Sequence, residues 1–447
     1  MKKIFIWILL YYLRFFAKLS LLINRPKVIG ITGSVGKSSA RNVIYAILKN
    51  HFKVKMIKEG NSETGIPLGI LGIDPGNYQI SDWLRIMILS PFKIFYLSGT
   101  KILIVEMGID SPYPPKNMDY LLSIVSPNIS VVLNVYPVHS EQFDSIITNN
   151  LSSEERTELI TERIAEEKTK IITKAKPAIG IYNSDNQFIK EQLSDYKATK
   201  LISFGKNSKN NISYGKYEVD LKKSCFELLF PRLRSKKVNI EIKGYFLPKK
   251  YQEILSAGFL VGLSLELSID KIKKSLIANF ILPAGRSSIF EGINDSVIID
   301  SSYNASRASL LTFIETTNLL SKKENRPFVV ILGDMRELGR EAEQEHKIVA
   351  EALKNTADYF FCVGELTKKY VLPEIKNGHW FKNSVELGQY LKTSLPYQSV
   401  VLVKGSQNTI FLEEAIKFIL KNKKDEKKLC RQNDFWLRQK SKFFQGV

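Results

Sequence analysis

The chain has 447 residues, enough for two or three domains, and with 44% of them hydrophobic it can bury a sizeable core. Its 65 Lys and Arg against 45 Asp and Glu give a net charge of +20, which suits an anionic membrane or a phosphorylated substrate; a nucleic-acid partner is not expected, because neither a zinc-finger spacing nor an aromatic RNA-binding motif occurs. The three cysteines are far apart and form no CxxC pair, which argues against a disulfide framework and for a reducing, cytoplasmic location.

The N-terminal segment is predicted to be an apolar helix with a basic stripe. On a helical wheel Lys3, Arg14, Lys18 and Arg25 share one narrow stripe, and the rest of the surface is mostly apolar. This pattern favours a helix that lies in the headgroups of the inner face of the plasma membrane, with residues 1–25 in contact with anionic lipid. The alternatives are a tilted span with snorkelling basic side chains, and packing on the protein body or on a second subunit.

The next segment, residues 28–39, reads as a short apolar strand, a glycine-rich turn and the start of a helix. Glycines in the turn let the backbone N–H groups point inward, and the positive end of the following helix points to the same place. Such a turn binds phosphate, with a lysine for the β- and γ-phosphates and a serine hydroxyl for Mg²⁺. A turn that binds nothing is the alternative, disfavoured by Gly-Lys-Ser directly after a strand. The predicted phosphate-binding residues are Gly33, Ser34, Val35, Gly36, Lys37, Ser38 and Ser39.

Two further buried-type strands are predicted at residues 102–106 and 130–135. The first ends on Glu106 and the second is followed by His139, so both would bring hard ligands to the edge where an α/β sheet binds its ligand. A separate apolar stretch, residues 83–96, is expected either to join the N-terminal helix at a membrane or to be ordinary core.

From about residue 28 to about residue 420, several stretches resemble the Mur ligase family, the ATP-dependent amide ligases of bacterial cell-wall assembly. They are residues 32–38, 106–108, 134–139, 183–186, 283–286, 300–305, 333–339 with His346, and 403–406. The stretch Gly-Asp-Met-Arg-Glu-Leu-Gly at 333–339 most resembles the branch of the family that adds D-alanyl-D-alanine to a UDP-muramoyl tripeptide.

The resemblance implies an α/β fold with a P-loop central ATPase domain on a parallel sheet and a C-terminal Rossmann-like α/β domain, preceded by the apolar N-terminal helix. The expected divisions are residues 1–27, 28–284, 285–425 and a basic, aromatic tail at 426–447, which is either a docking helix or a frayed end. Strand-like runs alternating with helical patterns after residue 297 independently predict a small parallel sheet.

Within the central domain the resemblance also implies roles for single residues. Lys37 and the loop amides would hold the phosphates of ATP, while Ser38 and Glu106 would bind one Mg²⁺ and His139 a second. Lys168 matches the lysine that the family carbamylates, and a carbamate turns a cation into a metal-binding anion. One more surface lysine is the alternative for Lys168.

Other residues would bind the rest of the nucleotide. Arg286 and Asp300 resemble the family's hinge arginine and ribose-binding aspartate, and Asn304 belongs to the same stretch as Asp300. Gln252 is the residue that keeps the adenine-facing amide in an otherwise altered segment. The implied catalytic set is Lys37, Glu106, His139, Lys168 and Arg286.

Three features depart from the D-alanyl-D-alanine-adding branch. Its members begin with a UDP-binding domain of many tens of residues, whereas Val28 already begins the ATP domain, so we expect the N-terminal helix to stand in place of that domain. Arg307 and Gln407 occupy positions where the branch usually has Pro and Arg. The sequence therefore does not establish that the amine-substrate pocket is that of the branch. The polar, strand-prone segment 205–243 is expected to form a small sheet appended to the ATP domain.

These features predict an ATP-dependent amide ligase of peptidoglycan precursor synthesis. ATP would convert a muramoyl-peptide carboxylate into an acyl phosphate, and an amine such as a dipeptide would displace the phosphate. Two other interpretations remain: an amide ligase for another acceptor, membrane-linked or not, and a membrane-attached scaffold that binds nucleotide without turnover. A nucleic-acid-dependent ATPase is a third alternative, supported only by the net charge.

Overall fold

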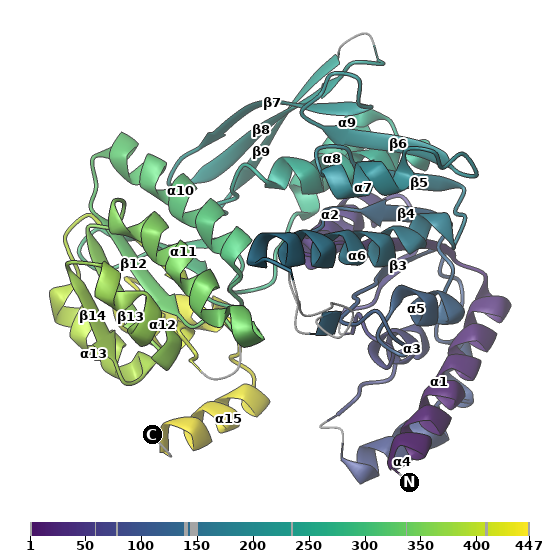
Figure 1. Cartoon of the computed structure of the whole chain (residues 1–447), viewed down its shortest axis with the longest axis horizontal. Helices are drawn as coiled ribbons and strands as arrows, with labels where there is room; N and C mark the ends of the chain where they lie inside the picture. Colours follow the sequence, from purple (N-terminus) through teal and green to yellow (C-terminus); the bar gives the residue numbers. More distant parts are fainter. Residues whose placement is uncertain are drawn as a thin grey trace. The chain divides into compact units, whose positions relative to one another are not determined.

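Two compact units make up the structure, a computed structural model (Figure 1). The residues that it describes are 2–58, 60–76, 79–137, 142–143, 151–233, 236–336, 338–406 and 410–445. Unit 1 comprises residues 1–215, 227–238 and 252–281, and unit 2 comprises residues 216–226, 239–251 and 282–447. The predicted domain boundaries at residues 27, 284 and 425 stay predictions.

A nine-stranded sheet, whose first six strands along the chain lie in unit 1 and whose last three are divided between the two units, has the order β2-β3-β1-β4-β5-β6-β7-β8-β9. Its strands are β1 (Lys27–Thr32), β2 (Val54–Met56), β3 (Ile102–Glu106), β4 (Ile129–Val132), β5 (Ile179–Asn183), β6 (Lys200–Gly205), β7 (Ile212–Val219), β8 (Lys223–Phe230) and β9 (Lys236–Lys243). Strand β1 lies between β3 and β4 and is parallel to both, and all residues of β3 and β4 are buried. Continuous apolar runs of this kind are typical of central parallel strands.

Helices pack around this sheet (Figure 1). They are α1 (Lys2–Asn24), α2 (Lys37–Leu48), α3 (Gly65–Leu71), α4 (Ile80–Leu89), the 3-10 helix η1 (Phe92–Phe95), α5 (Met118–Ile124), α6 (Ser153–Thr173), α7 (Gln187–Leu193), α8 (Tyr251–Ser264) and α9 (Ile269–Asn279). Helix α1 confirms the predicted N-terminal helix and ends before Pro26, and it contacts α3, α5 and η1. The strand, turn and helix predicted at residues 28–39 are β1, the glycine loop and α2.

The segment 205–243, predicted to form a small sheet appended to the ATP domain, does form strands, but they do not make a sheet of their own. Strands β7, β8 and β9 instead continue the main sheet from β6, where Phe204 pairs with Ile212. An open strand edge exposes unpaired N–H and C=O groups, and pairing with the next strand satisfies them. The polar turn at residues 207–211 carries no regular structure, as the sequence predicts.

A six-stranded sheet in the order β10-β11-β15-β12-β13-β14 forms the centre of unit 2. Its strands are β10 (Ser288–Glu291), β11 (Val297–Ser301), β12 (Phe328–Gly333), β13 (Tyr359–Val363), β14 (Gly378–Phe381) and β15 (Val400–Lys404). The four strands predicted from apolar runs are present and parallel, whereas the edge strand β10 pairs antiparallel with β11. The small parallel-sheet domain is therefore confirmed.

The helices of unit 2 surround this sheet, and the last of them settles the open question about the tail. They are α10 (Arg307–Glu324), η3 (Gly339–Glu341), α11 (Ala342–Lys354), α12 (Glu365–Tyr370), η4 (Leu372–Glu374), α13 (Ser384–Ser394), α14 (Glu413–Ile419), η5 (Lys423–Lys428) and α15 (Asp434–Gln445). Helix α15 packs on the buried ring of Phe411 through Trp436, Phe443 and Phe444. The tail is thus a docked helix.

Candidate active site

The glycine loop between β1 and α2 is held by one asparagine. Gly33 and Gly36 have φ angles of 156° and 85°, and Gly36 caps α2 in a left-handed conformation that glycine adopts readily. The backbone N–H of Ser34 donates to Asn134 O at 2.9 Å, and that of Val35 donates to Asn134 Oδ1 at 2.9 Å. The loop geometry is therefore fixed by the segment that follows β4.

The next residues bring a cation, a hydroxyl and a carboxylate together. Lys37 Nζ donates to Gly33 O at 2.7 Å, so its ammonium lies over the loop. In the register of β1 and β3, Ile31 is opposite Glu106, which puts that carboxylate beside the start of the loop. Ser38 Oγ donates to Glu106 Oε2 at 3.1 Å. The structure thus brings together three residues that the sequence assigns to phosphate and metal binding, while Ser39 is buried in the same turn of α2.

Arg41 is a residue of this cluster that the sequence analysis missed. Its Nη1 lies 2.7 Å from Glu106 Oε1, and the same nitrogen donates to Ile57 O and Lys58 O, each at 2.8 Å. The guanidinium offsets the cost of burying the Glu106 carboxylate, which is 4% exposed. The spacing in the sequence could have indicated it: Arg41 follows Ser38 by three residues and therefore lies on the same face of α2.

Lys168 lies in the interior of unit 1 on α6. It is 3% exposed, so the alternative of a surface lysine is wrong. Burial lowers the pKa of Lys168 well below its usual value, and the positive charge of Lys37 lowers it further, while Asp110 and Glu167 oppose the shift. Because the charge of Lys37 affects Lys168, the Lys168 amine lies within electrostatic range of the glycine loop. A neutral amine at this position is a nucleophile.

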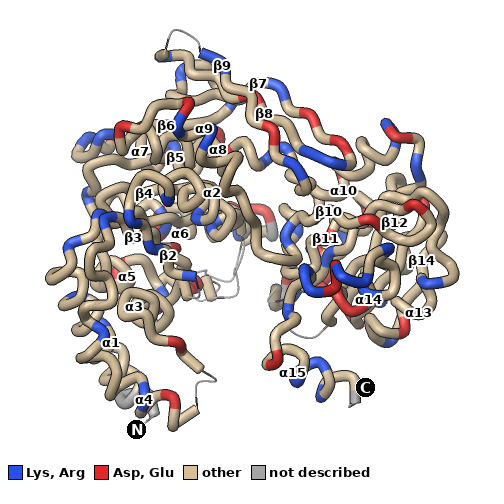
Figure 2. The backbone as a smooth tube through the Cα atoms, turned by 180° about the vertical axis from the view of Figure 1, so that it is seen from behind, with Lys and Arg blue, Asp and Glu red and all other residues tan. Residues whose placement is uncertain are grey.

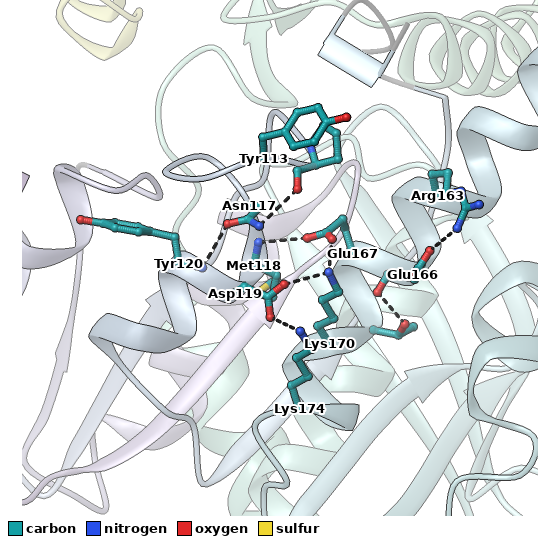
Figure 3. Close-up of polar contacts among 12 residues, drawn as sticks. Tyr113, Asn117, Met118, Asp119, Tyr120, Arg163, Glu166, Glu167, Lys170 and Lys174 are labelled. Atoms are coloured by element: carbon teal, nitrogen blue, oxygen red, sulfur yellow. Dashed lines mark hydrogen bonds and ion pairs between the residues drawn. The ribbon is translucent and has the colours of Figure 1, made fainter. Parts of the chain in front are cut away.

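A polar network holds this part of α6 against α5 (Figure 3). Lys170 Nζ pairs with Asp119 Oδ2 at 2.9 Å and with Glu167, and Lys174 Nζ pairs with Asp119 Oδ1 at 2.5 Å. Glu167 Oε2 also accepts from the backbone N–H of Met118 at 3.2 Å. Partial burial opposes ionisation of Asp119, but the hydrogen bonds from Lys174 and Lys170 outweigh it and hold its pKa below the ordinary value. The network fixes the helical turn that carries Lys168.

The metal ligands expected from the sequence are placed only in part. His139 lies outside the described residues. Among the described residues, no three or more His, Cys, Asp or Glu side chains gather into a ready-made metal site. The donors at hand nevertheless fit Mg²⁺, which prefers oxygen ligands and commonly takes one or two carboxylates together with substrate phosphates. Glu106 and the Ser38 hydroxyl are such oxygen donors, 3.1 Å apart.

Gln252, the residue expected to face adenine, is 1% exposed at the start of α8. Its Nε2 donates to Gly215 O at 3.2 Å, so the amide is held in one orientation. The next residue, Glu253, accepts a hydrogen bond from Asn134 Nδ2 at 3.3 Å and connects this helix to the glycine loop.

Within unit 2, the residues assigned to ribose and phosphate gather at the end of β11. The Arg286 guanidinium stacks over the Tyr303 ring at 4.5 Å. Asp300 is fully buried, and its Oδ1 accepts from the backbone N–H of Ser302 at 3.0 Å. Burial raises the pKa of Asp300 to about 6. Its Oδ2 is buried without a hydrogen-bond partner among the described residues, a feature that marks a polar atom with unused binding capacity.

Lys404 is a second residue to which the sequence assigned no role of its own, although it lies in the matched stretch 403–406. Its Nζ donates to Ser301 Oγ at 3.2 Å and to the backbone O of Asn304 at 2.9 Å, and the Asn304 residue is exposed. Burial lowers the pKa of Lys404 to about 7; the charge of Arg286 lowers it further and that of Asp300 opposes the shift. The buried amine thus contacts Asn304 and is influenced by the charges of Arg286 and Asp300.

The stretch 333–339 forms a rigid loop after β12. Thr367 donates to Asp334 Oδ1 from both its N–H at 2.8 Å and its hydroxyl at 2.9 Å. His346 Nε2 accepts from the N–H of Met335 at 3.1 Å, and its Nδ1 lies 2.6 Å from Ala342 O. The imidazole is therefore neutral with its proton on Nδ1, in agreement with a pKa that burial lowers. Arg307, at the start of α10, pairs with Glu345 at 2.5 Å.

The basic residues outside these clusters are distributed over the surface of both units, with acidic residues among them (Figure 2). Some form exposed pairs, such as Lys223 with Glu241 at 2.8 Å and Lys347 with Glu343 at 2.6 Å. Pairs of this kind contribute little to stability. The basic residues of these pairs therefore lie on solvated faces.

Comparisons with solved structures agree with this architecture. The MurF ligase of Thermotoga maritima, in a crystal structure with ADP, superposes with a TM-score of 0.71 at 23% identity, over 93% of this chain and 84% of that one. A MurF structure from Acinetobacter baumannii gives a TM-score of 0.68 at 19% identity, over 90% and 78%. Among characterised relatives, the UDP-N-acetylmuramoyl-tripeptide--D-alanyl-D-alanine ligase of Buchnera aphidicola is 26% identical over 87% of this chain and 75% of its own length.

Family models match the parts of the chain that carry the two clusters. The Mur ligase middle domain matches residues 31–248, which include the glycine loop, Glu106 and Lys168. The Mur ligase, glutamate ligase domain matches residues 285–407, which include Arg286, Asp300 and Lys404. With both models matched in order over most of its length, the chain belongs to the Mur ligase family of ATP-dependent, amide-forming ligases.

Proposed function

We propose that this protein joins D-alanyl-D-alanine, or a related amine, to the carboxylate of a muramoyl peptide. The names of the relatives support this substrate pair, since the matched enzymes of Buchnera aphidicola are UDP-N-acetylmuramoyl-tripeptide--D-alanyl-D-alanine ligases. The observation that carries the proposal is the cluster at the glycine loop, where Lys37, Ser38 and Glu106 come together on adjoining parallel strands and a helix. This arrangement suits the transfer of a phosphoryl group.

The reaction proceeds in two steps. A carboxylate oxygen of the acceptor attacks the γ-phosphorus of ATP, the bond to the β,γ-bridging oxygen breaks, and ADP and an acyl phosphate form. The amine nitrogen then attacks the acyl carbon, the carbon–oxygen bond to phosphate breaks, and the amine gives up a proton as the amide forms. Lys37 offsets the charge that gathers on the transferred group, and Arg286 has the same role.

Ser38 and Glu106 are the residues that would hold Mg²⁺, with His139 and a carbamylated Lys168 as further ligands. The ion would offset phosphate charge in the transition state. The low pKa of Lys168 supports carbamylation, because only the neutral amine reacts with CO₂. In that reaction the Lys168 nitrogen bonds to the carbon of CO₂ and loses a proton, which leaves a carbamate anion.

The rest of the nucleotide would be bound by Gln252 at adenine and by Arg286, Asp300 and Asn304 at ribose and phosphate. The unpartnered Oδ2 of Asp300 supports this assignment, because a ribose hydroxyl would supply the missing donor. That the related Thermotoga maritima structure contains ADP supports nucleotide use. The enzyme would work in the cytoplasm, where ATP is available, with residues 1–25 in contact with the anionic inner membrane.

The test is to incubate the protein with ATP, D-alanyl-D-alanine and UDP-muramoyl tripeptide, in soluble and lipid-linked forms, and to identify the new amide by mass. ADP release should require both the amine and the carboxylate. ADP release with the lipid-linked form alone would assign a membrane-linked acceptor. Nucleotide binding without ADP release under any of these conditions would overturn the ligase and leave a scaffold.

A further inference from the structure

Helix α1 has two apolar faces, and the described part of the protein covers only one of them. Leu10, Leu13 and Ala17 are buried against the body of unit 1. On the opposite face Ile8, Phe15 and Leu22 recur at seven-residue spacing and are 60 to 66% exposed. A helix that is apolar all round is normally buried on every side, by protein or by lipid. Among the residues that the structure describes, none covers the outer face of α1 as the inner face is covered.

Two neighbouring elements extend this exposed face. On α4, Ile80, Leu84 and Ile88 recur at four-residue spacing, with exposures between 58 and 82%. On η1, Phe92 and Phe95 are exposed as well. We call the exposed apolar residues of α1, α4 and η1 together the outer apolar face; they are Ile6, Ile8, Tyr11, Phe15, Leu22, Ile23, Ile80, Leu84, Ile88, Phe92 and Phe95.

The three elements are joined into one body. Tyr12 Oη donates to Met87 O at 2.7 Å and connects α1 with α4. Asn24 Nδ2 donates to Ile94 O at 2.7 Å and connects α1 with η1. Leu13 and Ile86 share a small core cluster beneath them. Figures 1 and 2 show α1 and α4 side by side from opposite directions, so their exposed residues belong to adjoining surfaces.

The charged groups on these elements are mostly basic. Lys18 of α1, Arg85 of α4 and Lys93 of η1 are exposed, as is Arg25 just after α1. The single acidic residue within the described parts of α1, α4 and η1 is Asp82, whose carboxylate lies 3.9 Å from Arg85. The exposed Asp74 precedes α4. Exposed apolar and aromatic side chains with lysines and arginines among them match the interface of an anionic bilayer, where the apolar groups reach the acyl boundary and the cations remain at the headgroups.

We propose that α1, α4 and η1 form a docking surface that lies in the plane of an anionic membrane. This inference rests on the membrane contact proposed above for residues 1–25 and extends it to a three-element surface of the folded unit. By length and composition residues 6–24 could also cross a bilayer. A span would break the contacts that tie α1 to the protein, among them the 3.0 Å hydrogen bond from Arg14 Nη1 to Ser123 Oγ. The contacts therefore favour docking over insertion.

The test uses the full chain and vesicles of phosphatidylcholine, with and without phosphatidylglycerol. The wild type should float with the anionic vesicles and only weakly with the neutral ones. The variant Phe15→Gln/Leu84→Gln/Phe92→Gln, changed only at exposed positions, should lose at least about tenfold in vesicle affinity. The matched control Ile277→Gln/Leu319→Gln removes exposed apolar side chains elsewhere and should bind like the wild type.

Other outcomes would overturn the docking surface. Failure of the wild-type protein to bind anionic vesicles would overturn it. So would a triple variant that binds the vesicles as tightly as the wild type and has the same thermal unfolding curve. A wild-type dimer that the triple variant loses would assign the surface to a second copy. Resistance of the bound protein to alkaline carbonate would indicate a span. ADP release with soluble substrates is measured on the same samples, so a failed ligase reaction and a failed docking surface are told apart.

Discussion

Arg41 Nη1 lies 2.7 Å from Glu106 Oε1, and the two side chains are 9% and 5% exposed. The guanidinium occupies one carboxylate oxygen, and the other oxygen accepts from the Ser38 hydroxyl. Arg41 comes from the helix after the glycine loop and Glu106 from the end of β3, so the ion pair joins the loop helix to the neighbouring strand. The contact orients the carboxylate and gives its buried charge a partner.

Removing Arg41 should therefore cost far more than removing an exposed arginine. Arg41→Ala leaves the Glu106 carboxylate buried without its cation, and we expect unfolding in urea to show a loss of about 3–5 kcal/mol. Arg163→Ala breaks the Arg163–Glu166 pair, which has a similar distance of 2.8 Å but is about half exposed, and should cost less than about 1 kcal/mol. Equal effects of the two variants would contradict the role given to burial.

The second prediction concerns Lys37. Its ammonium lies 2.7 Å from Gly33 O, over the loop that is proposed to hold the phosphates. Lys37→Ala should lower turnover by roughly 10² to 10³, the scale of one preorganised electrostatic contact, with little change in thermal unfolding. Lys49→Ala, on an exposed position at the end of the same helix, is the control. The assignment is wrong if the initial rate of ADP release is unchanged in Lys37→Ala.

A third prediction follows from the buried amine of Lys168. Because burial lowers its pKa well below the usual value, the neutral amine that reacts with CO₂ forms more readily than at an exposed lysine. Enzyme freed of CO₂ should lose ligase activity and regain it on addition of bicarbonate, and the intact mass should increase by one CO₂. Lys190→Gln removes an exposed amine on α7 and should leave this bicarbonate response in place. Activity and mass that are both independent of bicarbonate would exclude carbamylation.

Local patterns predicted much of this fold. The strand, glycine loop and helix start at residues 28–39 were predictable because the apolar periodicity and the Gly-Lys-Ser sequence lie within a dozen consecutive residues. Strands β11, β12, β13 and β15 were predicted because central parallel strands read as unbroken apolar runs. The edge strands β10 and β14 were missed, since they are short and only partly buried. Edge position depends on the neighbouring strand, which the segment's own sequence does not contain.

The site residues that belong to a local sequence motif could be predicted. Those whose role depends on tertiary packing could not. Lys37 and Ser38 belong to the motif, whereas the pairing of Arg41 depends on the register that places Glu106 opposite Ile31. The buried position of Lys404 depends in the same way on β15 lying beside β11. The strand-prone character of segment 205–243 is visible in its own sequence, but its alternating polarity reports one exposed face and not which strand edge is available for pairing. The sequence therefore does not predict that these strands extend the main sheet.

The buried amine of Lys404 should leave a mark on the pH dependence of stability. Its pKa is about 7 in the folded protein and near the usual value of roughly 10.4 once unfolded, so between these values unfolding takes up a proton. Stability conferred by this site therefore rises with pH across that window, and below pH 7 the folded protein bears the cost of a buried ammonium. We compare the free energy of unfolding of the wild type with that of Lys404→Met, each measured by urea unfolding. Between pH 7 and pH 9 the difference should rise with pH at a slope that approaches the uptake of one proton on unfolding. The exposed substitution Lys392→Met should run parallel to the wild type over the same range, and a Lys404→Met curve that also runs parallel would show that Lys404 remains charged in the folded state.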